Sequence, residues 1–212
     1  MPRPPADAPL LNLGLIRRTA LRLIDQDGLE ALSMRKLASE LKVTPRSLYH
    51  YVPTKDALLR EVYVSVLEEL ELPDPHAMIW QDGLRLLAHR FRDLALEHRS
   101  VASYFLGDNP PTLQELAVLE YIVKLLRVAG LEEADLLGTA HVLIVLIVSY
   151  IASEVNAKSD PIFLAERRAL AATQLESFPA LLTAFAASDD ATKTDFDVAL
   201  ELLIGGVEGR VG

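Results

Sequence analysis

Apolar residues recur three and four positions apart along almost the whole chain, which is the spacing of one face of an α-helix. No segment keeps the strict alternation of apolar and polar residues, bounded by hairpin turns, that predicts a β-strand. In the first 72 residues the pattern predicts a helix over about residues 10–27, short helices over 34–41 and 45–51, and a longer one over 54–72. The fold is therefore predicted to be all-α.

The residues at the predicted helix ends agree with this division. Ser33, Thr44 and Thr54 each stand just before a helix, where a side-chain oxygen can accept a hydrogen bond from a free backbone N–H. Gly28 ends the first helix, and Pro45 takes the first position of its helix, where the missing N–H removes no hydrogen bond. Two short helices joined by a tight turn, between longer helices, are the parts of a helix-turn-helix.

The second short helix, PRSLYHY, decides the function of such a motif, because this helix enters the major groove of DNA. Only Leu48 in it is purely apolar, and the other side chains offer donors and aromatic rings suited to bases and phosphates. The alternative is a solvent-facing polar helix with Tyr49 or Tyr51 packed in the core, and for Tyr51 the sequence favours neither reading. The residues of this segment predicted to contact DNA are Thr44, Arg46, Ser47, Tyr49, His50 and Tyr51.

Charge is divided unevenly along the chain. Residues 1–60 hold ten Lys or Arg and six Asp or Glu, a net charge of +4. Because the whole chain carries −9, the remainder carries −13. A basic head attracts phosphates and an acidic body repels them, so we expect double-stranded DNA to bind at the head.

The segment LSMRKLASELKVTPRSLYHYVPTKDALL resembles the DNA-binding head of the Tet repressor (TetR) family, and the likeness runs from about residue 10 to residue 70. This resemblance implies a ligand-responsive transcriptional regulator, a repressor that binds a palindromic operator. It implies base or near-base contacts for Arg35, Arg46 and Ser47, and phosphate contacts for Tyr49, Tyr51 and Lys55. Lys55 also stands in the first turn of its helix, where free N–H groups and the helix dipole attract phosphate. Pro45 replaces a polar base reader of the family's namesake, so the namesake's operator does not carry over.

Residues 73–212 are predicted to form an effector-binding and dimerisation domain, after a DNA-binding domain over residues 1–72. The helices predicted in it cover residues 78–98, 100–106, 112–128, 132–157, 162–174 and 195–207. The last helix has an apolar face and, with residues 142–152, offers more apolar surface than one small bundle buries. A homodimer would bury this surface and bring two heads to two operator half-sites, whereas the alternative is a monomer with a large core.

The apolar stretch LLGTAHVLIVLIVSYIA, residues 136–152, raises the alternative of a membrane span. A spanning helix needs about 20 apolar residues, whereas this stretch is shorter, contains His141 and has acidic neighbours without flanking Lys or Arg. We therefore predict a helix of a soluble protein, buried on most sides, and no membrane partner. The start of the chain lacks the apolar run of a secretory signal, so we expect a cytoplasmic protein.

The second domain resembles, more weakly, that of the tetracycline repressors themselves, through EHRSVASYFLGDNPPT and FDVALELLIGGVEGRV. The resemblance places Leu87, Phe105 and Ile122 where an amide, a metal-binding histidine and a second amide would hold a magnesium–tetracycline chelate, and only Phe91 matches. Because a divalent metal needs oxygen or imidazole ligands, we expect a largely apolar effector instead. The residues predicted to line its pocket are Leu87, Phe91, Tyr104, Phe105, Tyr121, Ile122 and His141. For His141, a place in the core or in an interface is the alternative.

Other chemistry has little support in the sequence. The chain has no cysteine, which excludes disulfides and thiolate metal sites, and its histidines form no H-E-x-x-H pattern. We interpret His89 and Asp93, four positions apart, as a hydrogen-bonded pair rather than a catalytic dyad. We therefore expect no enzymatic activity, no metal and no cofactor. A helical enzyme with a nucleophile and base in a body cavity, and an architectural protein with a solid body core, are the alternatives.

Overall fold

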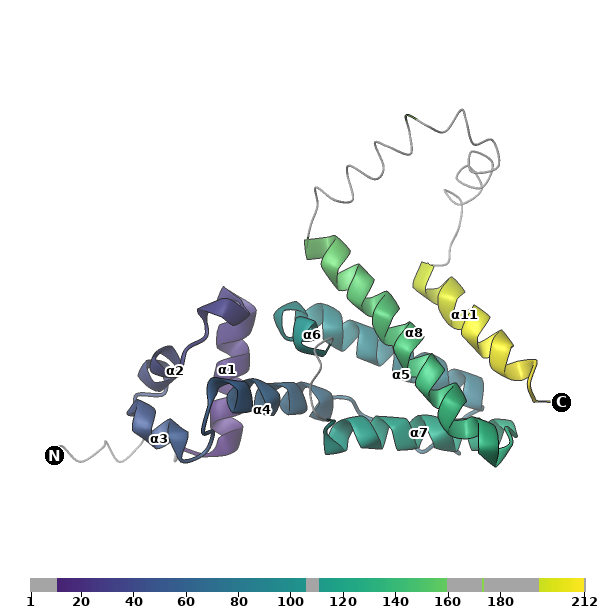
Figure 1. Cartoon of the computed structure of the whole chain (residues 1–212), viewed down its shortest axis with the longest axis horizontal. Coiled ribbons are helices and arrows are strands. Elements are labelled where there is room, and N and C mark those ends of the chain that lie inside the picture. The colour runs from purple at the N-terminus through teal and green to yellow at the C-terminus, as the bar shows by residue number, and fades with distance from the viewer. Residues whose placement is uncertain (1–10, 106–110, 160–172, 174–194, 212) are drawn as a thin grey trace. The chain divides into compact units, whose positions relative to one another are not determined.

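A computed structural model describes residues 11–105, 111–159, 173 and 195–211, without the side chains of residues 103–105 and 156–159 (Figure 1). Every regular element within these residues is a helix, which confirms the all-α prediction. The elements are α1 (Leu13–Asp27), the 3-10 turn η1 (Leu29–Ala31), α2 (Met34–Glu40), α3 (Pro45–Tyr49), α4 (Lys55–Glu68), α5 (Trp80–Glu97), α6 (Arg99–Phe105), α7 (Leu113–Ala129), α8 (Glu133–Ser159) and α11 (Asp195–Glu208). The helix predicted over residues 162–174 lies outside the described residues.

Two helix ends differ by three or more residues from the sequence-based prediction. Helix α1 begins at Leu13 rather than near residue 10, because the side chain of Asn12 accepts a hydrogen bond from the backbone N–H of Leu15 and caps it. Helix α4 ends at Glu68, four residues before the predicted end. Beyond Glu68 the helical pattern gives way to tighter turns, in which the N–H of Leu70 bonds the carbonyl of Leu67 and the N–H of Glu71 bonds that of Glu69.

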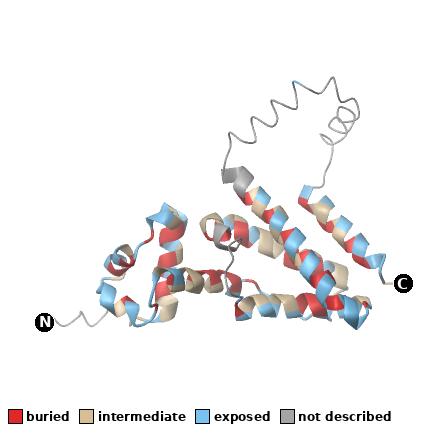
Figure 2. Cartoon of the chain, viewed as in Figure 1, coloured by how far each residue is buried: buried red, intermediate tan, exposed pale blue. Residues whose placement is uncertain are grey.

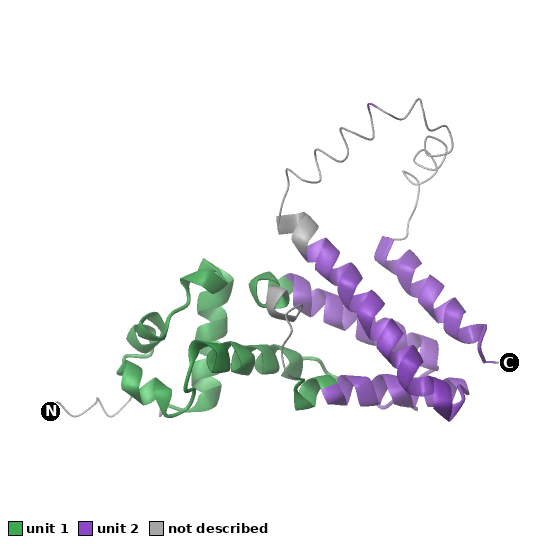
Figure 3. Ribbon diagram, viewed as in Figure 1, with its two compact units in different colours: residues 1–71, 97–115 green, residues 72–96, 116–212 purple. Residues whose placement is uncertain are grey.

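The chain divides into two compact units, which Figure 3 distinguishes by colour. The first unit contains residues 1–71 and 97–115, so that α6 belongs with the helix-turn-helix. The second unit contains residues 72–96 and 116–212. A DNA-binding domain over residues 1–72 and an effector domain over residues 73–212 stay a prediction.

The core of the first unit holds the short helices in place. Helix α1 packs against α2 and α4, and α2 packs against α3. Gly28 stops α1 with a positive φ of 84°, a region of backbone space that favours glycine. The fully buried residues that these helices contribute include Ile16, Ile24, Leu37, Leu48, Leu58 and Val62 (Figure 2). Because α3 is only five residues long, its orientation depends on this packing and on its caps rather than on its own hydrogen bonds.

Polar contacts attach residues 97–115 to the head. His98 is buried, and its Nδ1 lies 3.0 Å from Oδ2 of Asp25 on α1. At the start of α7, Thr112 and Glu115 form a capping box, in which each side chain accepts a hydrogen bond from the other residue's backbone N–H. The hydroxyl of Tyr63 on α4 donates to the same Glu115 at 2.5 Å. The first unit is therefore joined by hydrogen bonds as well as by apolar packing.

The second unit is built from α5, α7, α8 and α11. Its buried residues include Leu84, Leu87, Ile122, Leu125, Leu126, Leu143, Ile147, Leu200 and Ile204. Gly83 lets α7 approach α5 closely, since a Cβ atom at this position would lie 2.7 Å from Cδ2 of Leu125. The apolar residues recognised by their helical spacing are thus those that form this core.

Helix α8 is less buried than the sequence suggests. Its stretch Glu133–Val155 is long and apolar enough to cross a membrane, but only 28% of its most apolar window is buried within the chain. The prediction of a helix buried on most sides is therefore wrong for a single copy of this chain. Length and composition of one helix are weak evidence for a membrane span.

Candidate DNA-binding surface and effector site

Helix α3 is fixed by its first residues. Oγ1 of Thr44 accepts a hydrogen bond from the backbone N–H of Ser47 at 3.3 Å, and the two hydroxyl oxygens lie 2.9 Å apart. Pro45 follows at the first helical position. Leu48 is the only side chain of α3 that is buried. Thr44 and Ser47 therefore belong first to the cap, and the rest of α3 points away from the core.

The side chains predicted to read DNA are exposed on this helix and its neighbour. Arg46, Tyr49 and His50 are exposed, and half of the Tyr49 side chain is accessible to solvent. Arg35 is exposed on α2. A recognition helix needs one apolar side that packs on the head, here Leu48, and one polar side that is free to enter the major groove.

Tyr51 is not packed in the core, which was one of the two readings of it from the sequence, and its contact with DNA stays a prediction. Its hydroxyl donates a hydrogen bond to the backbone carbonyl of Leu11 at 2.7 Å, while 44% of the residue stays exposed. This hydrogen bond therefore joins Leu11, which precedes the cap of α1, to Tyr51, which follows the end of α3. The predicted phosphate contact of Tyr51 would need the same hydroxyl.

The cations of the head divide into two groups. Arg17, Arg22 and Lys36 form ion pairs with acidic residues of the head, at 2.8 Å between Lys36 and Asp27. By contrast, the predicted DNA contacts Arg35, Arg46 and Lys55 form no ion pair with any residue that the structure describes. The three predicted contacts thus have no competing acidic partner within the described residues, a property that they share with Arg18 and Lys42.

Two local features complete the surface. Lys55 is the first residue of α4, and the side chain of Thr54 caps this helix by accepting from the backbone N–H of Ala57 at 3.0 Å. The remaining N–H groups and the helix dipole make this end favourable for a phosphate. Lys42, in the turn between α2 and α3, has a positive φ of 55°. Glycine more often occupies such a left-handed position, and a lysine there gives no signal of it in the sequence.

The structure places the predicted effector residues in different surroundings. Leu87, Tyr121 and Ile122 are buried in the second unit, and Phe91 is half-buried on α5. The side chains of Tyr104 and Phe105 lie outside the described residues. His141 is exposed on α8, on the same side as the exposed Val142 and Val145, whereas Leu87, Tyr121 and Ile122 are buried on α5 and α7.

Tyr121 is chemically unusual among these residues. It is 4% exposed, and its hydroxyl makes no hydrogen bond with the described part of the chain. Burial raises the pKa of this phenol, Arg90 acts against that shift and Asp74 adds to it. The neutral hydroxyl is therefore an unused polar group within an apolar core, where leaving it unpaired costs free energy.

A row of polar contacts joins α5 to α11, which the sequence analysis did not predict. Gln81 bonds Glu208 at 2.9 Å, and Arg85 bonds both carboxylate oxygens of Glu201 at 2.8 and 3.0 Å. The hydrogen bonds that Arg85 donates to Glu201 and Asp82 raise its pKa against the opposing effect of burial. Gln81 and Arg85 stand four positions apart on α5, so they lie in one stripe along that helix.

Further along the same stripe, the predicted pairing of His89 with Asp93 is wrong. Nε2 of His89 lies 3.2 Å from Oδ1 of Asp197 on α11, because this face of α5 is turned towards α11. Arg92 forms a two-pronged bond with Glu154 at 2.6 Å and lies 5.3 Å above the ring centre of Phe196. The bonds to Glu154 raise the pKa of Arg92 despite partial burial. Such long-range partners leave no signal in the spacing along a chain.

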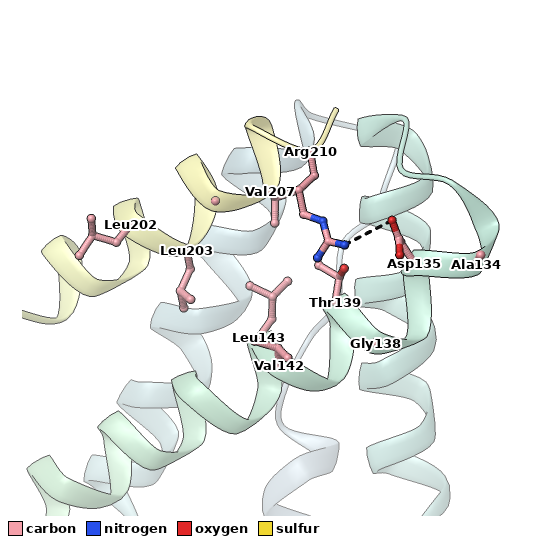
Figure 4. Close-up of a pocket in the computed structure, with 11 residues that line it drawn as sticks. Ala134, Asp135, Gly138, Thr139, Val142, Leu143, Leu202, Leu203, Val207 and Arg210 are labelled. Atoms are coloured by element: carbon pink, nitrogen blue, oxygen red, sulfur yellow. Dashed lines mark ion pairs between the residues drawn. The ribbon is translucent and has the colours of Figure 1, made fainter. Parts of the chain in front are cut away.

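Helices α8 and α11 enclose a groove of about 440 Å³. At one end, Nη2 of Arg210 lies 3.4 Å from Oδ2 of Asp135 (Figure 4). The lining residues are Ala134, Asp135, Gly138, Thr139, Val142, Leu143, Leu202, Leu203, Gly206, Val207 and Arg210. Among the described residues there is no cluster of three or more His, Asp or Glu side chains that could hold a metal ion.

Two family models match the chain. Residues 16–62 match the one described as bacterial regulatory proteins, tetR family, and residues 72–211 match the tetracyclin repressor-like C-terminal domain. An HTH-type transcriptional regulator of Saccharopolyspora erythraea is 31% identical over 215 residues, which cover 96% of this chain and 87% of that protein. The tetracycline repressor protein class E of Escherichia coli is 35% identical over 103 residues, about half of each chain.

Solved structures agree with these matches. The TetR family protein ActR of Streptomyces coelicolor, in complex with (S)-DNPA, is 29% identical and superposes with a TM-score of 0.76 over 96% of this chain and all of that one. ActR in complex with actinorhodin is 28% identical, with a TM-score of 0.75 over 93% and 95% of the two chains. BioQ with its double-stranded DNA operator, at 21% identity and a TM-score of 0.67, shares the fold.

Proposed function

The chain belongs to the TetR family of transcriptional regulators, and we propose that it is a repressor. In this proposal it binds a palindromic operator as a homodimer and leaves the operator when a largely apolar molecule binds. As a member of that family it is a ligand-responsive, DNA-binding regulator and not an enzyme. Because a transcriptional regulator must reach the chromosome, we propose that the protein is cytoplasmic.

The observation that carries the DNA-binding part is the exposed face of α3. Arg46, Tyr49 and His50 project from a helix whose single buried residue, Leu48, anchors it to the head. Arg46 has no acidic partner among the described residues, so its guanidinium is available for a base edge, as a guanine accepts from arginine. We propose direct base contacts for Arg46 and Arg35, and phosphate contacts for Lys55 and Tyr49.

The remaining predicted contacts have narrower roles in this proposal. Thr44 and Ser47 hold the N-terminus of α3 at the groove, since their hydroxyls are bonded to each other and to the backbone. His50 supplies a polar tip at the other end of the helix. A tyrosine hydroxyl has a single proton to donate, so Tyr51 contacts a phosphate by exchanging its bond to the carbonyl of Leu11 for one to a phosphate oxygen.

The effector part rests on the apolar surroundings of α5 and α7. Leu87 and Ile122 are buried, and Phe91 is half-buried, so a ligand between these helices would meet hydrocarbon and one phenol. The unpaired hydroxyl of Tyr121 is suited to orient one polar group of an otherwise apolar molecule. We include Tyr104, Phe105 and His141 as proposed contacts on the sequence alone. ActR, which resembles this chain over nearly its whole length, has been solved with actinorhodin and with (S)-DNPA, which supports an organic effector.

Selection from a pool of random DNA duplexes tests the proposed function. The full chain should enrich an inverted repeat whose half-sites are centred about one helical turn, ~34–36 Å, apart. Arg46→Ala should lose the enriched sequence, whereas Lys124→Ala, which removes another exposed cation, from α7, should retain it. Recovery of unrelated duplexes by the parent chain, or of the same repeat by Arg46→Ala, would contradict the proposal.

A further inference from the structure

The turn between α2 and α3 carries a lysine at a position that suits glycine. In this turn the backbone N–H of Val43 bonds the carbonyl of Ala38 at 2.9 Å, and the N–H of Lys42 bonds that of Ser39 at 3.1 Å. These two bonds form a Schellman motif, a common end of an α-helix. The residue after the C-cap of this motif has left-handed geometry, and here it is Lys42, with a φ of 55°.

The lysine makes the isolated head less stable than a glycine would. In left-handed geometry the Cβ atom of an L-residue comes too close to a carbonyl oxygen, and glycine has no such atom. No contact within the described residues offsets this cost, because Lys42 is exposed and its ammonium forms no ion pair or hydrogen bond with any of them. Strained backbone of this kind gathers at binding sites, where the side chain has a task outside the fold.

Lys42 stands directly before the part of α3 that is proposed to enter the major groove. It precedes the N-cap Thr44 by two residues and Arg46 by four. A helix with its side chains is about 10–12 Å across, and the major groove is about 12 Å wide. A helix that lies in the groove therefore fills its width. The chain that leads into this helix must pass the rim of the groove, where the phosphates of a strand lie.

The charges beside the turn favour an anion at this place. Glu40 is the acidic residue nearest to Lys42 in the sequence, and its carboxylate is paired with Arg22 at 2.5 Å. On the other side of the N-cap, Arg46 is exposed and has no acidic partner among the described residues. A lysine ammonium on its flexible stem binds phosphate as a point charge, without the strict geometry that a base edge requires.

We propose that Lys42 binds a DNA phosphate at the rim of the major groove, and that this contact is the function of a side chain which the turn itself disfavours. The inference rests on the proposed DNA contacts of α3 and adds one that comes from the turn. Because every nucleotide has a phosphate, the contact strengthens binding to every sequence and helps to fix the position of α3 in the groove. The same residue thus lowers the stability of the head and raises its affinity for DNA.

Three substitutions of Lys42 separate the charge from the backbone strain. Lys42→Gly removes both, Lys42→Gln removes the charge alone, and Lys42→Arg keeps both. Fluorescence anisotropy measures the affinity of each full chain for the selected operator and for a scrambled duplex between 0.05 and ~0.2 M salt, the range over which phosphate contacts weaken. Urea unfolding of the same proteins measures stability. Lys124→Gln, which removes an exposed charge from α7, is the matched control.

We expect Lys42→Gly to unfold at a higher urea concentration than the parent and to bind both duplexes more weakly. One phosphate contact per copy contributes about 0.9 to the slope of log affinity against log salt, so a homodimer should lose about 1.8. Over this fourfold range of salt the parent should then lose about twelvefold more affinity than the variant. Lys42→Gln should lose the same slope and unfold as the parent does, and Lys42→Arg should keep the slope.

The outcomes separate this inference from the proposed function. A slope that Lys42→Gly and Lys42→Gln leave unchanged would overturn the phosphate contact, even where Arg46→Ala loses the operator as proposed. Weaker binding of the operator alone would make Lys42 a reader of bases, and an equal change in Lys124→Gln would reduce its effect to net charge; both overturn the inference. Unfolding of Lys42→Gly at lower urea would assign the lysine to stability instead. A parent chain that selects no repeat would overturn the proposed function itself.

Discussion

Replacing Arg46 and Lys55 separately should divide DNA recognition into a sequence-reading part and an electrostatic part. Neither side chain has an ion-pair partner among the described residues, so alanine at either position removes no bond that holds the head together. The free energy of unfolding should therefore stay within ~0.5 kcal/mol of the parent, as for most surface substitutions away from caps and ion pairs. Any larger effect then belongs to the complex with DNA.

The magnitudes follow from where the two residues stand. Arg46 is exposed on α3, so Arg46→Ala should cost about 1–3 kcal/mol per half-site and relax the preference for the base that it contacts. Lys55 opens α4, where it would neutralise one phosphate. Each neutralised phosphate contributes about 0.9 to the slope of log affinity against log salt, so Lys55→Ala should reduce the slope of a homodimer by about 1.8.

Fluorescence anisotropy with the selected operator and with a scrambled duplex, at several salt concentrations, measures both quantities. Lys124→Ala is the matched control, because it removes the same charge from the second unit. The reasoning fails if Arg46→Ala weakens both duplexes equally, or if Lys55→Ala keeps the slope of the parent. It fails as well if Lys124→Ala changes the slope as much as Lys55→Ala does.

Three further variants test single features. Leu202→Glu places a charge at an exposed apolar position of α11, where the sequence predicts the dimer surface, so it should give folded monomers in sedimentation; unchanged dimers would place the interface elsewhere. Lys42→Gly removes a side chain from a left-handed position and should raise the free energy of unfolding by up to about 1 kcal/mol in urea, and a decrease would contradict this. Tyr51→Phe loses the bond to Leu11 and should lower stability by about 1 kcal/mol; an unchanged value would show that the bond contributes nothing.

The helix-turn-helix was predictable because its information is local. Thr44, Pro45 and Thr54 specify helix starts by their own chemistry, and the structure has α3 and α4 beginning where these residues require. Leu48 could be predicted as the buried anchor because it is the only purely apolar residue of the segment PRSLYHY. The end of α4 was placed too late, because apolar spacing continues to Leu70 after the helical hydrogen bonds have stopped.

The polar contacts of the second unit could not be predicted in the same way. His89 has Asp93 at helical distance and Asp197 more than one hundred positions away, and the structure pairs it with the second. Which carboxylate pairs with His89 depends on which helix the polar side of α5 faces. The packing of Leu84 and Leu87 on the other side of α5 sets that orientation. The spacing of apolar residues was enough to predict helix α5, whereas the partner of His89 depends on tertiary packing.

Helix α5 joins the proposed effector site to the predicted dimer surface on α8 and α11 through its two faces. Leu87 and Phe91 stand opposite the stripe of Arg85 and its neighbours, which bonds α11. A ligand changes DNA affinity only if it favours one arrangement of the subunits over another, and a shift of α5 would carry α11 with it through these bonds. Arg85→Gln, which leaves Glu201 without its two-pronged partner, should therefore speed subunit exchange, with Lys124→Gln as control. If Arg85→Gln exchanges subunits at the parent's rate, α5 does not hold the dimer surface in place and the connection between the two sites must run elsewhere.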